Sequence, residues 1–336
     1  MLFTLHCALS DYEVFTNEAD NVRMMSILRT LIISMANFIM KIVPKMLNLL
    51  VPRRFLACAF SSSCQPDLGA IRRELDKFEG GTVDLKMDEQ SGVAVMTLNN
   101  PLRLNSMTGR MMVDMADCIT RLENWPSGKG LILTGTGGNF CSGGDLTFVR
   151  KALHYGAEMA AFQHDALTRL LNLPLISVAL LQGHTLGGGA ELATACDYRV
   201  ISPSAKVGFV QIKMGLTTGW GATTRLVHLL GRQKAISLLT SGKVMAAEEA
   251  LNEGLVDHVL PYSLASSDEL GECKKWLIAN YCKHDADLIQ ATKKSVIYAD
   301  LNRDIKVSLQ HERDVFAKYW GGPAQKAALS ANIKHK

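Results

Sequence analysis

The pattern of apolar and polar positions changes its period repeatedly along the chain from about residue 67 onward. Short apolar runs that end at Gly, Asn or Pro predict strands, at residues 92–99, 130–135, 175–181, 198–201 and 206–208. Apolar residues spaced three and four apart predict helices, at residues 108–124, 146–155, 159–171, 187–195, 246–252, 268–281, 286–298 and 305–319. Strands that alternate with helices, followed by helices alone, predict an α/β fold with a helical C-terminal region.

The same pattern divides the chain into an N-terminal extension at 1–66, a core at 67–265 that carries the site, and a helical region at 266–336. Residues 24–66 contain Arg, Lys and three consecutive serines but no Asp or Glu, which is typical of a mitochondrial presequence. A poorly ordered extension without a structural role is the alternative. The longest uncharged run, residues 30–40, is shorter than the roughly 20 apolar residues that a bilayer crossing needs. We therefore expect no membrane anchor.

Composition narrows the class of protein. Of the 336 residues, 48% are hydrophobic and 20% are charged, which predicts a folded chain with a sizeable core. A net charge of +4 is small for a nucleic-acid-binding protein, so we expect no nucleic-acid partner. The eight cysteines form no Cys-x-x-Cys pair and no zinc spacing, so we expect reduced, mostly buried thiols and no metal site.

Two glycine-rich loops carry the candidate chemistry. Residues 139–145 (NFCSGGD) and 183–192 (GHTLGGGAEL) each follow an apolar strand and precede a helix. Glycines let a backbone approach a ligand closely, so two such loops can each direct one N–H at the same oxygen, as in an oxyanion hole. A tight turn without function is the alternative. No Gly-Lys-Ser/Thr follows the glycines, and no Gly-x-Gly-x-x-Gly opens the first strand-to-helix turn, which argues against a nucleotide site.

Several segments together resemble the crotonase (enoyl-CoA hydratase/isomerase) superfamily. They are the two glycine loops, NNPLRLNSM at 99–107, VGFVQIKMGLTTGWGATTRL at 207–226 and ALNEGLVDHVL at 250–260. The resemblance covers residues 80–325 and implies a crotonase fold, a spiral of β-β-α repeats with a helical C-terminal trimerisation region. It also implies an acyl-CoA substrate, a homotrimer or dimer of trimers, and no separate cofactor, because coenzyme A is part of the substrate.

The resemblance assigns roles to residues of the two loops. The amides of Ser142 and Gly188 are similar to the two oxyanion-hole donors, and Glu191 is similar to the first of two hydratase glutamates. Glu191 would then orient the substrate carboxylate or deliver a proton, although a carboxylate there also suits a helix N-terminus. A further loop segment resembles the wall that holds the CoA adenine in the family; it consists of Ser142, Gly143, Gly144 and Asp145.

Further residues have both a functional and a structural interpretation. Thr217, Thr218 and Trp220 fall where the substrate pocket wall is expected, with Trp220 either a lid over the acyl branch or a packing residue. His184 lies in the second loop, where we expect it to face solvent rather than take part in catalysis. The lysines at 293–294 lie where the family places groups near CoA phosphates, and a solvated helix face is the favoured alternative.

The chain departs from the hydratase pattern at residue 211. The second hydratase glutamate is expected twenty residues after Glu191, and that position is Gln211. A carboxamide does not exchange protons near neutral pH, whereas the family hydrates enoyl-CoA with two carboxylates. Decarboxylation of a malonyl-type thioester needs only an oxyanion hole for the enolate and one returned proton. We therefore expect decarboxylation rather than hydration.

Within the superfamily, the resemblance is closest to enzymes that decarboxylate ethylmalonyl-CoA and also methylmalonyl-CoA. It is carried by LPLISVALLQG at 173–183, KKSV at 293–296 and HERDVFAKYWGGPA at 311–324. It implies a cytosolic metabolite-repair role that clears a side product of acetyl-CoA carboxylase; the mitochondrion is the alternative if translation starts at Met24 or Met25. The other activities considered are an isomerase or thioesterase with Glu191 as sole base, and a silent homologue that binds acyl-CoA or RNA.

Overall fold

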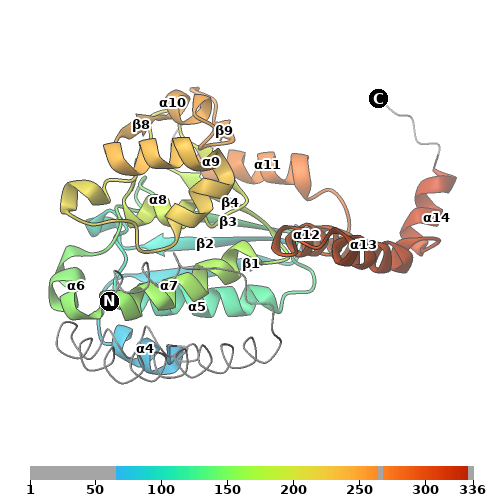
Figure 1. Cartoon of the computed structure of the whole chain (residues 1–336). Coiled ribbons are helices and arrows are strands. Elements are labelled where there is room, and N and C mark those ends of the chain that lie inside the picture. Colours follow the sequence, from blue (N-terminus) through green and yellow to red (C-terminus); the bar gives the residue numbers. More distant parts are fainter. Residues whose placement is uncertain (1–65, 264–267, 332–336) are drawn as a thin grey trace, which may run out of the picture. The chain divides into compact units, whose positions relative to one another are not determined.

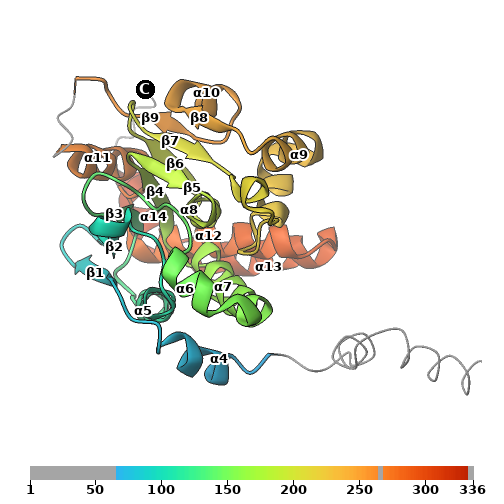
Figure 2. The same cartoon turned by 90° about the vertical axis from the view of Figure 1, so that its left-hand side faces the viewer.

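The computed structural model describes residues 66–263 and 268–331, so nearly all of the expected extension at 1–66 lies outside the described residues. The larger sheet has the strand order β1-β2-β3-β4-β6-β9 (Figures 1 and 2). Its strands are β1 (Thr82–Asp88), β2 (Val93–Asn99), β3 (Gly130–Gly135), β4 (Ile176–Leu181), β6 (Tyr198–Ile201) and β9 (His258–Val259). The β1–β2 pair is antiparallel and every later pair is parallel, in registers such as Gly130 opposite Ile176.

A smaller sheet has the order β5-β7-β8, with strands β5 (His184–Leu186), β7 (Lys206–Gly208) and β8 (Val244–Ala246). Strands β4 and β5 are followed by α8 (Gly188–Ala193), and strands β6 and β7 by α9 (Ala222–Ser241). Each of these β-β-α units places its first strand in the larger sheet and its second strand in the smaller one. The predicted α/β fold and its β-β-α repeats are therefore confirmed.

Side chains of the larger sheet alternate between two apolar cores, because successive residues of a strand point to opposite faces. On one face they pack with the helices α5 (Gly109–Glu123) and α7 (Gly156–Leu171), and the strand residues there include Met96, Leu98, Leu131, Leu133 and Leu181. On the other face they pack with α11 (Glu269–Tyr281), and the strand residues there are Val93, Ile132, Val178, Leu180 and Val200. The central strands are thus covered on both faces, as buried parallel strands require.

Shorter elements complete the described chain. Before and between the strands lie α4 (Leu68–Leu75), the 3₁₀ turns η1 (Pro101–Arg103), η2 (Leu153–Tyr155) and η3 (Gln211–Met214), α6 (Leu146–Lys151) and α10 (Ala247–Asn252). The helix predicted at 146–155 is therefore two elements, α6 and η2. Thr108 caps α5 by accepting a hydrogen bond from the Met111 amide at 3.2 Å, as its position before an apolar-periodic run predicts.

The C-terminal region is helical, as predicted. It continues from α11 with α12 (Ala286–Leu301), α13 (Ile305–Tyr319) and α14 (Pro323–Ser330), which lie at the end of the sheet remote from α6 (Figure 1). Helices α13 and α14 have no buried residue in the single chain. Large apolar side chains are exposed along them, among them Ile305, Phe316, Trp320 and Leu329.

The described residues contain neither a candidate membrane-spanning helix nor a candidate metal site. No helix within residues 66–263 and 268–331 is long and apolar enough to cross a membrane. In the same residues, no group of three or more His, Cys, Asp or Glu side chains could hold a metal ion.

All five cysteines in the described part of the chain are buried and free of disulfides: Cys118, Cys141, Cys196, Cys273 and Cys282. Burial raises the pKa of Cys141, Cys196 and Cys273 to about 12, above the ordinary thiol value of 9.0. As the pH rises above 9, the unfolded chain loses these protons before the folded chain does. We therefore expect the free energy of unfolding to fall between pH 9 and 12, by up to ~1.4 kcal/mol per thiol and pH unit.

Urea unfolding at pH 8 and pH 10 measures this effect. Labelling with a thiol reagent, followed by mass spectrometry of the peptides, should show these five cysteines modified slowly in the folded protein and rapidly in urea. Equal midpoints at both pH values, together with fast labelling of the folded protein, would contradict the expectation.

Candidate active site

The two glycine-rich loops lie side by side at the carboxyl ends of β3 and β4. Cys141 in the first loop forms a bridge with Thr185 in the second: the Cys141 amide donates to the His184 carbonyl at 3.1 Å, and the Leu186 amide donates to the Cys141 carbonyl at 2.9 Å. Neighbouring parallel strands end at the same edge of a sheet, which brings the loops together. The juxtaposition expected from the sequence is therefore present.

The backbone amides of the loops differ in whether they are available to a ligand. The amide of Ser142 donates to the Leu104 carbonyl at 3.0 Å, so the prediction that it is an oxyanion donor is wrong. The amides of Gly144 and Gly188 have no hydrogen-bond partner among the described residues. Gly144 and Gly188 are therefore the pair of donors that can bind one oxygen.

Close approach of the loops depends on Gly143. Its φ of +105° lies in the region that favours glycine, and a Cβ atom there would be 3.2 Å from the Gly188 nitrogen. A side chain at Gly143 would strain this backbone and crowd the Gly188 amide. Gly143 thus allows the two loops to approach each other closely, and it also lines a cavity at this site.

Two cavities meet at the two free amides. One, of about 430 Å³, is lined on its outer side by Arg103, Ser142, Asp145 and other loop residues. The other, of about 320 Å³, is lined mainly by apolar side chains: Phe148, Val149, Ala152, Leu153, Met159, Leu216 and Trp220. Gly144, Gly188 and Gln211 line both cavities. A thioester bound across the junction would place its oxygen at the amides, with the CoA arm in the first cavity and the acyl group in the second.

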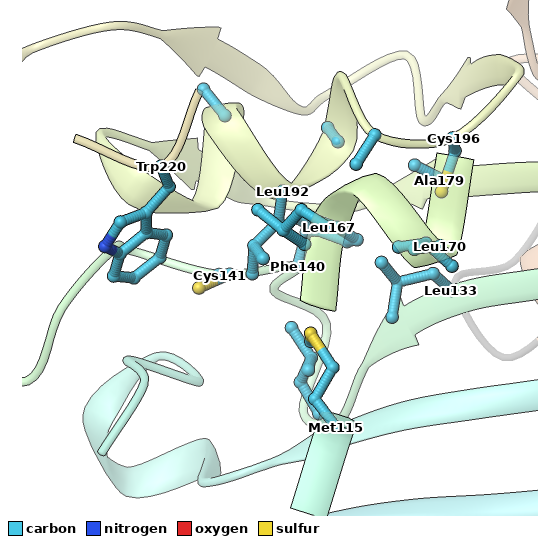
Figure 3. Packing of buried hydrophobic residues seen from close by; sticks show 14 of the residues in the cluster. Met115, Leu133, Phe140, Cys141, Leu167, Leu170, Ala179, Leu192, Cys196 and Trp220 are labelled. Carbon is cyan, nitrogen blue, oxygen red and sulfur yellow. The ribbon is translucent and has the colours of Figure 1, made fainter. Parts of the chain in front are cut away.

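The apolar cavity is closed on one side by Trp220, which is 5% exposed. An added Cβ on Gly188 would lie 2.4 Å from the Trp220 ring, so the indole packs directly on the first turn of α8. Figure 3 shows the ring beside the helix that carries Leu192. Apart from the Trp220 indole, the polar side chains among the lining residues are those of Glu191, Gln211 and Thr217, and none of the lining residues is Lys, Arg or His.

Glu191 is 2% exposed, and its carboxylate is held by four N–H donors. Oε1 accepts from Gln211 Nε2 at 2.8 Å and from the Gly219 amide at 3.2 Å. Oε2 accepts from the Trp220 amide at 2.7 Å and from the Ala222 amide at 3.2 Å. Because every partner is a donor, the arrangement matches a carboxylate that only accepts. Glu191 thus fastens the loop that carries Trp220 to α8.

Arg225, on α9, holds the same loop and was not identified from the sequence. Its guanidinium donates to the Trp220 carbonyl at 2.6 Å, to the Glu191 carbonyl at 3.0 Å and to Thr194 Oγ1 at 2.9 Å. Burial lowers the pKa of Arg225 to about 10, and the nearby Glu191 charge opposes that shift. The sequence pattern contains no signal that separates Arg225 from the solvent-facing side chains of its helix.

Gln211 begins η3 and turns its two amide atoms in different directions. Nε2 donates to Glu191, whereas Oε1 is buried and has no partner among the described residues. Gln211 lines both cavities. Among the described residues bonded to Glu191, Gln211 is therefore the one with a buried and unpaired polar atom, Oε1, that could bind a ligand.

The remaining predicted residues have mixed outcomes. Asp145 lines the first cavity, but its Oδ1 caps α6 by accepting from the Thr147 and Phe148 amides, each at 2.9 Å. Thr217 lines the apolar cavity, whereas Thr218 is a lining residue of neither cavity and its hydroxyl contacts that of Thr223, so its role as a pocket residue stays a prediction.

Two predicted basic groups lie apart from the cavities. His184 is exposed, as expected, and its Nδ1 contacts Asn139 Oδ1 at 3.0 Å. Lys293 is only 6% exposed and donates to Asp197 at 2.6 Å and to the Leu175 carbonyl at 2.5 Å. The structure supports neither interpretation of Lys293, as a group near the CoA phosphates or as part of a solvated helix face, because its buried ammonium group joins α12 to the sheet.

Comparisons with known proteins agree with this architecture. The model of the Enoyl-CoA hydratase/isomerase family matches residues 88–327. A relative from Gallus gallus, named ethylmalonyl-CoA decarboxylase, is 42% identical over 283 residues, which cover 83% of this chain and 93% of the relative. A relative of the same name from Homo sapiens is 41% identical over 269 residues, which cover 79% of this chain and 85% of the relative.

Solved structures extend the likeness to the fold. The crystal structure of an enoyl-CoA hydratase from Thermoplasma volcanium matches with a TM-score of 0.63 and 26% identity, over 75% of this chain and 97% of that one. An enoyl-CoA hydratase from Bacillus anthracis matches with a TM-score of 0.63 and 25% identity, over 75% of this chain and 95% of that one. The chain belongs to the enoyl-CoA hydratase/isomerase family, the crotonase superfamily.

Proposed function

We propose that this protein is an acyl-CoA decarboxylase that acts on ethylmalonyl-CoA and, with it, methylmalonyl-CoA. Relatives that are 41–42% identical over most of the chain bear the name ethylmalonyl-CoA decarboxylase. The observation on the molecule that carries the proposal is the junction where the free amides of Gly144 and Gly188 face an apolar cavity lined by no basic side chain. The two amides can stabilise the negative charge of an enolate, and the cavity has no basic side chain that would retain the substrate carboxylate by an ion pair.

In the proposed reaction, the thioester oxygen lies between the Gly144 and Gly188 amides. The bond between C2 and the carboxylate carbon breaks, and its electron pair forms the enolate, whose negative charge is on the thioester oxygen. Hydrogen bonds to that oxygen strengthen as the charge develops, and one such donor contributes about 2.7–4 kcal/mol to lowering the barrier. A proton then adds to C2 and completes the acyl-CoA product.

The apolar cavity suits both groups on C2. The ethyl branch can pack against side chains such as Phe148 and Leu216, with Trp220 covering it. The carboxylate, in a cavity lined by no cation, loses hydration without gaining an ion pair, which favours its conversion to neutral CO₂. We assign Glu191 a positioning role here, because its two oxygens are occupied by Gln211 and the amides of the Trp220 loop.

Incubation of the purified protein with ethylmalonyl-CoA tests the proposal. We expect release of the carboxyl group as CO₂ or bicarbonate with accumulation of butyryl-CoA, turnover of methylmalonyl-CoA as well, and no hydration of crotonyl-CoA. Isomerisation of enoyl-CoA or hydrolysis of plain acyl-CoA, without turnover of any malonyl-type thioester, would instead support the isomerase or thioesterase alternative. Tight CoA binding without any turnover would indicate a silent acyl-CoA-binding homologue.

We also propose that the protein forms a homotrimer or a dimer of trimers through its C-terminal helices. The apolar side chains exposed along α13 and α14 support this, because such a surface is typical of a region covered by another chain. Light scattering of the purified protein measures the mass directly. A monomer at micromolar concentration would overturn the proposal.

For location we propose the cytosol. Asp11, Glu13, Glu18 and Asp20 precede the basic, acid-free segment 24–66, and acidic residues next to such a segment weaken a mitochondrial import signal. Fusions of residues 1–66 and 24–66 to a fluorescent reporter test this. Import of the 1–66 fusion into mitochondria would overturn the proposal, whereas import of the 24–66 fusion alone would make location depend on the start site.

A further inference from the structure

One residue that lines the apolar cavity carries a buried polar atom without a partner among the described residues. The proposed decarboxylation, in turn, has one step for which no proton source has been assigned. The atom is Oε1 of Gln211, which lines the cavity beside Gly144 and Gly188. A buried carbonyl oxygen without a partner is energetically unfavourable, so such an atom is ordinarily paired with a ligand or a water molecule. The atom therefore marks a place where a hydrogen-bond donor binds.

The orientation of the Gln211 amide is fixed by its neighbour. A glutamine amide can be turned over, which exchanges its nitrogen and oxygen. Here the atom that faces Glu191, at 2.8 Å, has to be the nitrogen, because a carboxylate accepts hydrogen bonds and an oxygen in its place would be repelled. The oxygen is consequently turned away from Glu191, on a residue that lines both cavities, and it can only accept.

The other polar groups of the cavity do not supply the proton as readily. Glu191 lines the same cavity, but its two carboxylate oxygens accept hydrogen bonds from four N–H donors and hold the Trp220 loop. The Gln211 oxygen carries no proton of its own. A water molecule has two donor hydrogens, so it can bind Gln211 Oε1 with one and direct the other at a neighbouring carbon. Thr217, which lines the same cavity, offers a second polar contact.

On the basis of the proposed decarboxylase function, we propose that Gln211 Oε1 holds the water molecule that protonates C2 of the enolate. The C2–carboxylate bond breaks and leaves CO₂ and the enolate. The enolate electron pair then takes a proton from the water, which forms the new C2–H bond and hydroxide. The hydroxide adds to CO₂, so that alkylmalonyl-CoA and water give acyl-CoA and bicarbonate. Gln211 is thereby a positioning residue that fixes the face of C2 to which the proton is added.

The stereochemistry of protonation tests this role, because a purely structural role would not change it. Turnover of ethylmalonyl-CoA in D₂O should give butyryl-CoA with one deuterium at C2 in a single configuration. Gln211→Met removes the acceptor at similar side-chain length, and we expect it to give both configurations, with KM changed less than about twofold. Gln90→Met, the same substitution in an exposed turn that lines neither cavity, should leave the single configuration intact.

Each outcome has a defined meaning. A single configuration retained by Gln211→Met would overturn the proposal, as would mixed configurations from the unaltered enzyme. A large rise in KM with the configuration retained would show instead that Gln211 Oε1 binds an amide of the CoA arm. If the unaltered enzyme decarboxylates no alkylmalonyl-CoA, the proposed function fails and the role of Gln211 fails with it. Melting temperature and CoA retention establish that Gln211→Met is folded.

Discussion

Replacing Gly188 by proline is expected to lower the turnover of ethylmalonyl-CoA by at least ~100-fold, because it removes one of two hydrogen bonds to the developing enolate oxygen. Gly188 is the first residue of α8, and its amide has no partner among the described residues. Proline is tolerated at the first position of a helix, where the missing N–H breaks no helical hydrogen bond. The substitution is therefore expected to remove the donor while keeping the helix.

Gly188→Ala is the matched control for this prediction. Any side chain at Gly188 meets the Trp220 ring, which would lie 2.4 Å from an added Cβ, so both variants displace the indole. Alanine retains the amide and proline does not. We expect Gly188→Ala to lose some activity through the displaced ring, and Gly188→Pro to lose at least tenfold more, with CoA still bound by both. Equal losses would assign the effect to Trp220 and remove the oxyanion role of Gly188.

The central strands are the part of the fold that the sequence predicts best. Strands β3 and β4 are covered on both faces, and such strands are continuous apolar runs between turn residues. Strand β1 is not predicted, because it lies at the edge of the sheet and its sequence TVDLKMD mixes charged and apolar residues with only Val83 buried. Strands β5, β8 and β9 have two or three residues each, too few to establish an alternation.

The sequence predicts which two loops form the candidate site, but it does not predict which of their backbone amides are free to bind a ligand. Glycines mark both loops, but which amides are free depends on distant partners. The Leu104 carbonyl that occupies the Ser142 amide comes from a turn 38 residues earlier in the chain. The same limit applies to Lys293, whose partner Asp197 is 96 residues away. Local patterns do not contain such long-range pairings.

The role of Gln211 is predictable from the sequence only in part. Its residue type, read at the position of a hydratase glutamate, predicts the loss of one acid–base group. The sequence does not indicate that its nitrogen would hold Glu191 while its oxygen stays buried without a partner among the described residues. That division depends on the 2.8 Å contact between the two side chains, which is a property of the folded molecule.

Restoring a carboxylate at this position is expected to weaken decarboxylation. Gln211→Glu replaces the Nε2 donor, 2.8 Å from Glu191, with an oxygen that Glu191 repels. A hydrogen bond to a charged group is worth about 1.5–3 kcal/mol, so losing this one and adding repulsion should lower kcat/KM by about 100-fold. The new charge also opposes binding of a substrate that already carries a carboxylate. Trace hydration of crotonyl-CoA should appear, because two carboxylates then face the cavity.

The reciprocal double variant, Glu191→Gln with Gln211→Glu, separates charge from position. It keeps one carboxylate and one carboxamide, but the amides of Gly219, Trp220 and Ala222 lose a carboxylate that accepts from all three. We expect no recovery of decarboxylation, because the Trp220 loop depends on a carboxylate at residue 191 itself. Rates with ethylmalonyl-CoA and crotonyl-CoA, measured for both variants beside the unaltered enzyme, provide the test. Full activity of Gln211→Glu, or recovery in the double variant, would show that this network does not control the site.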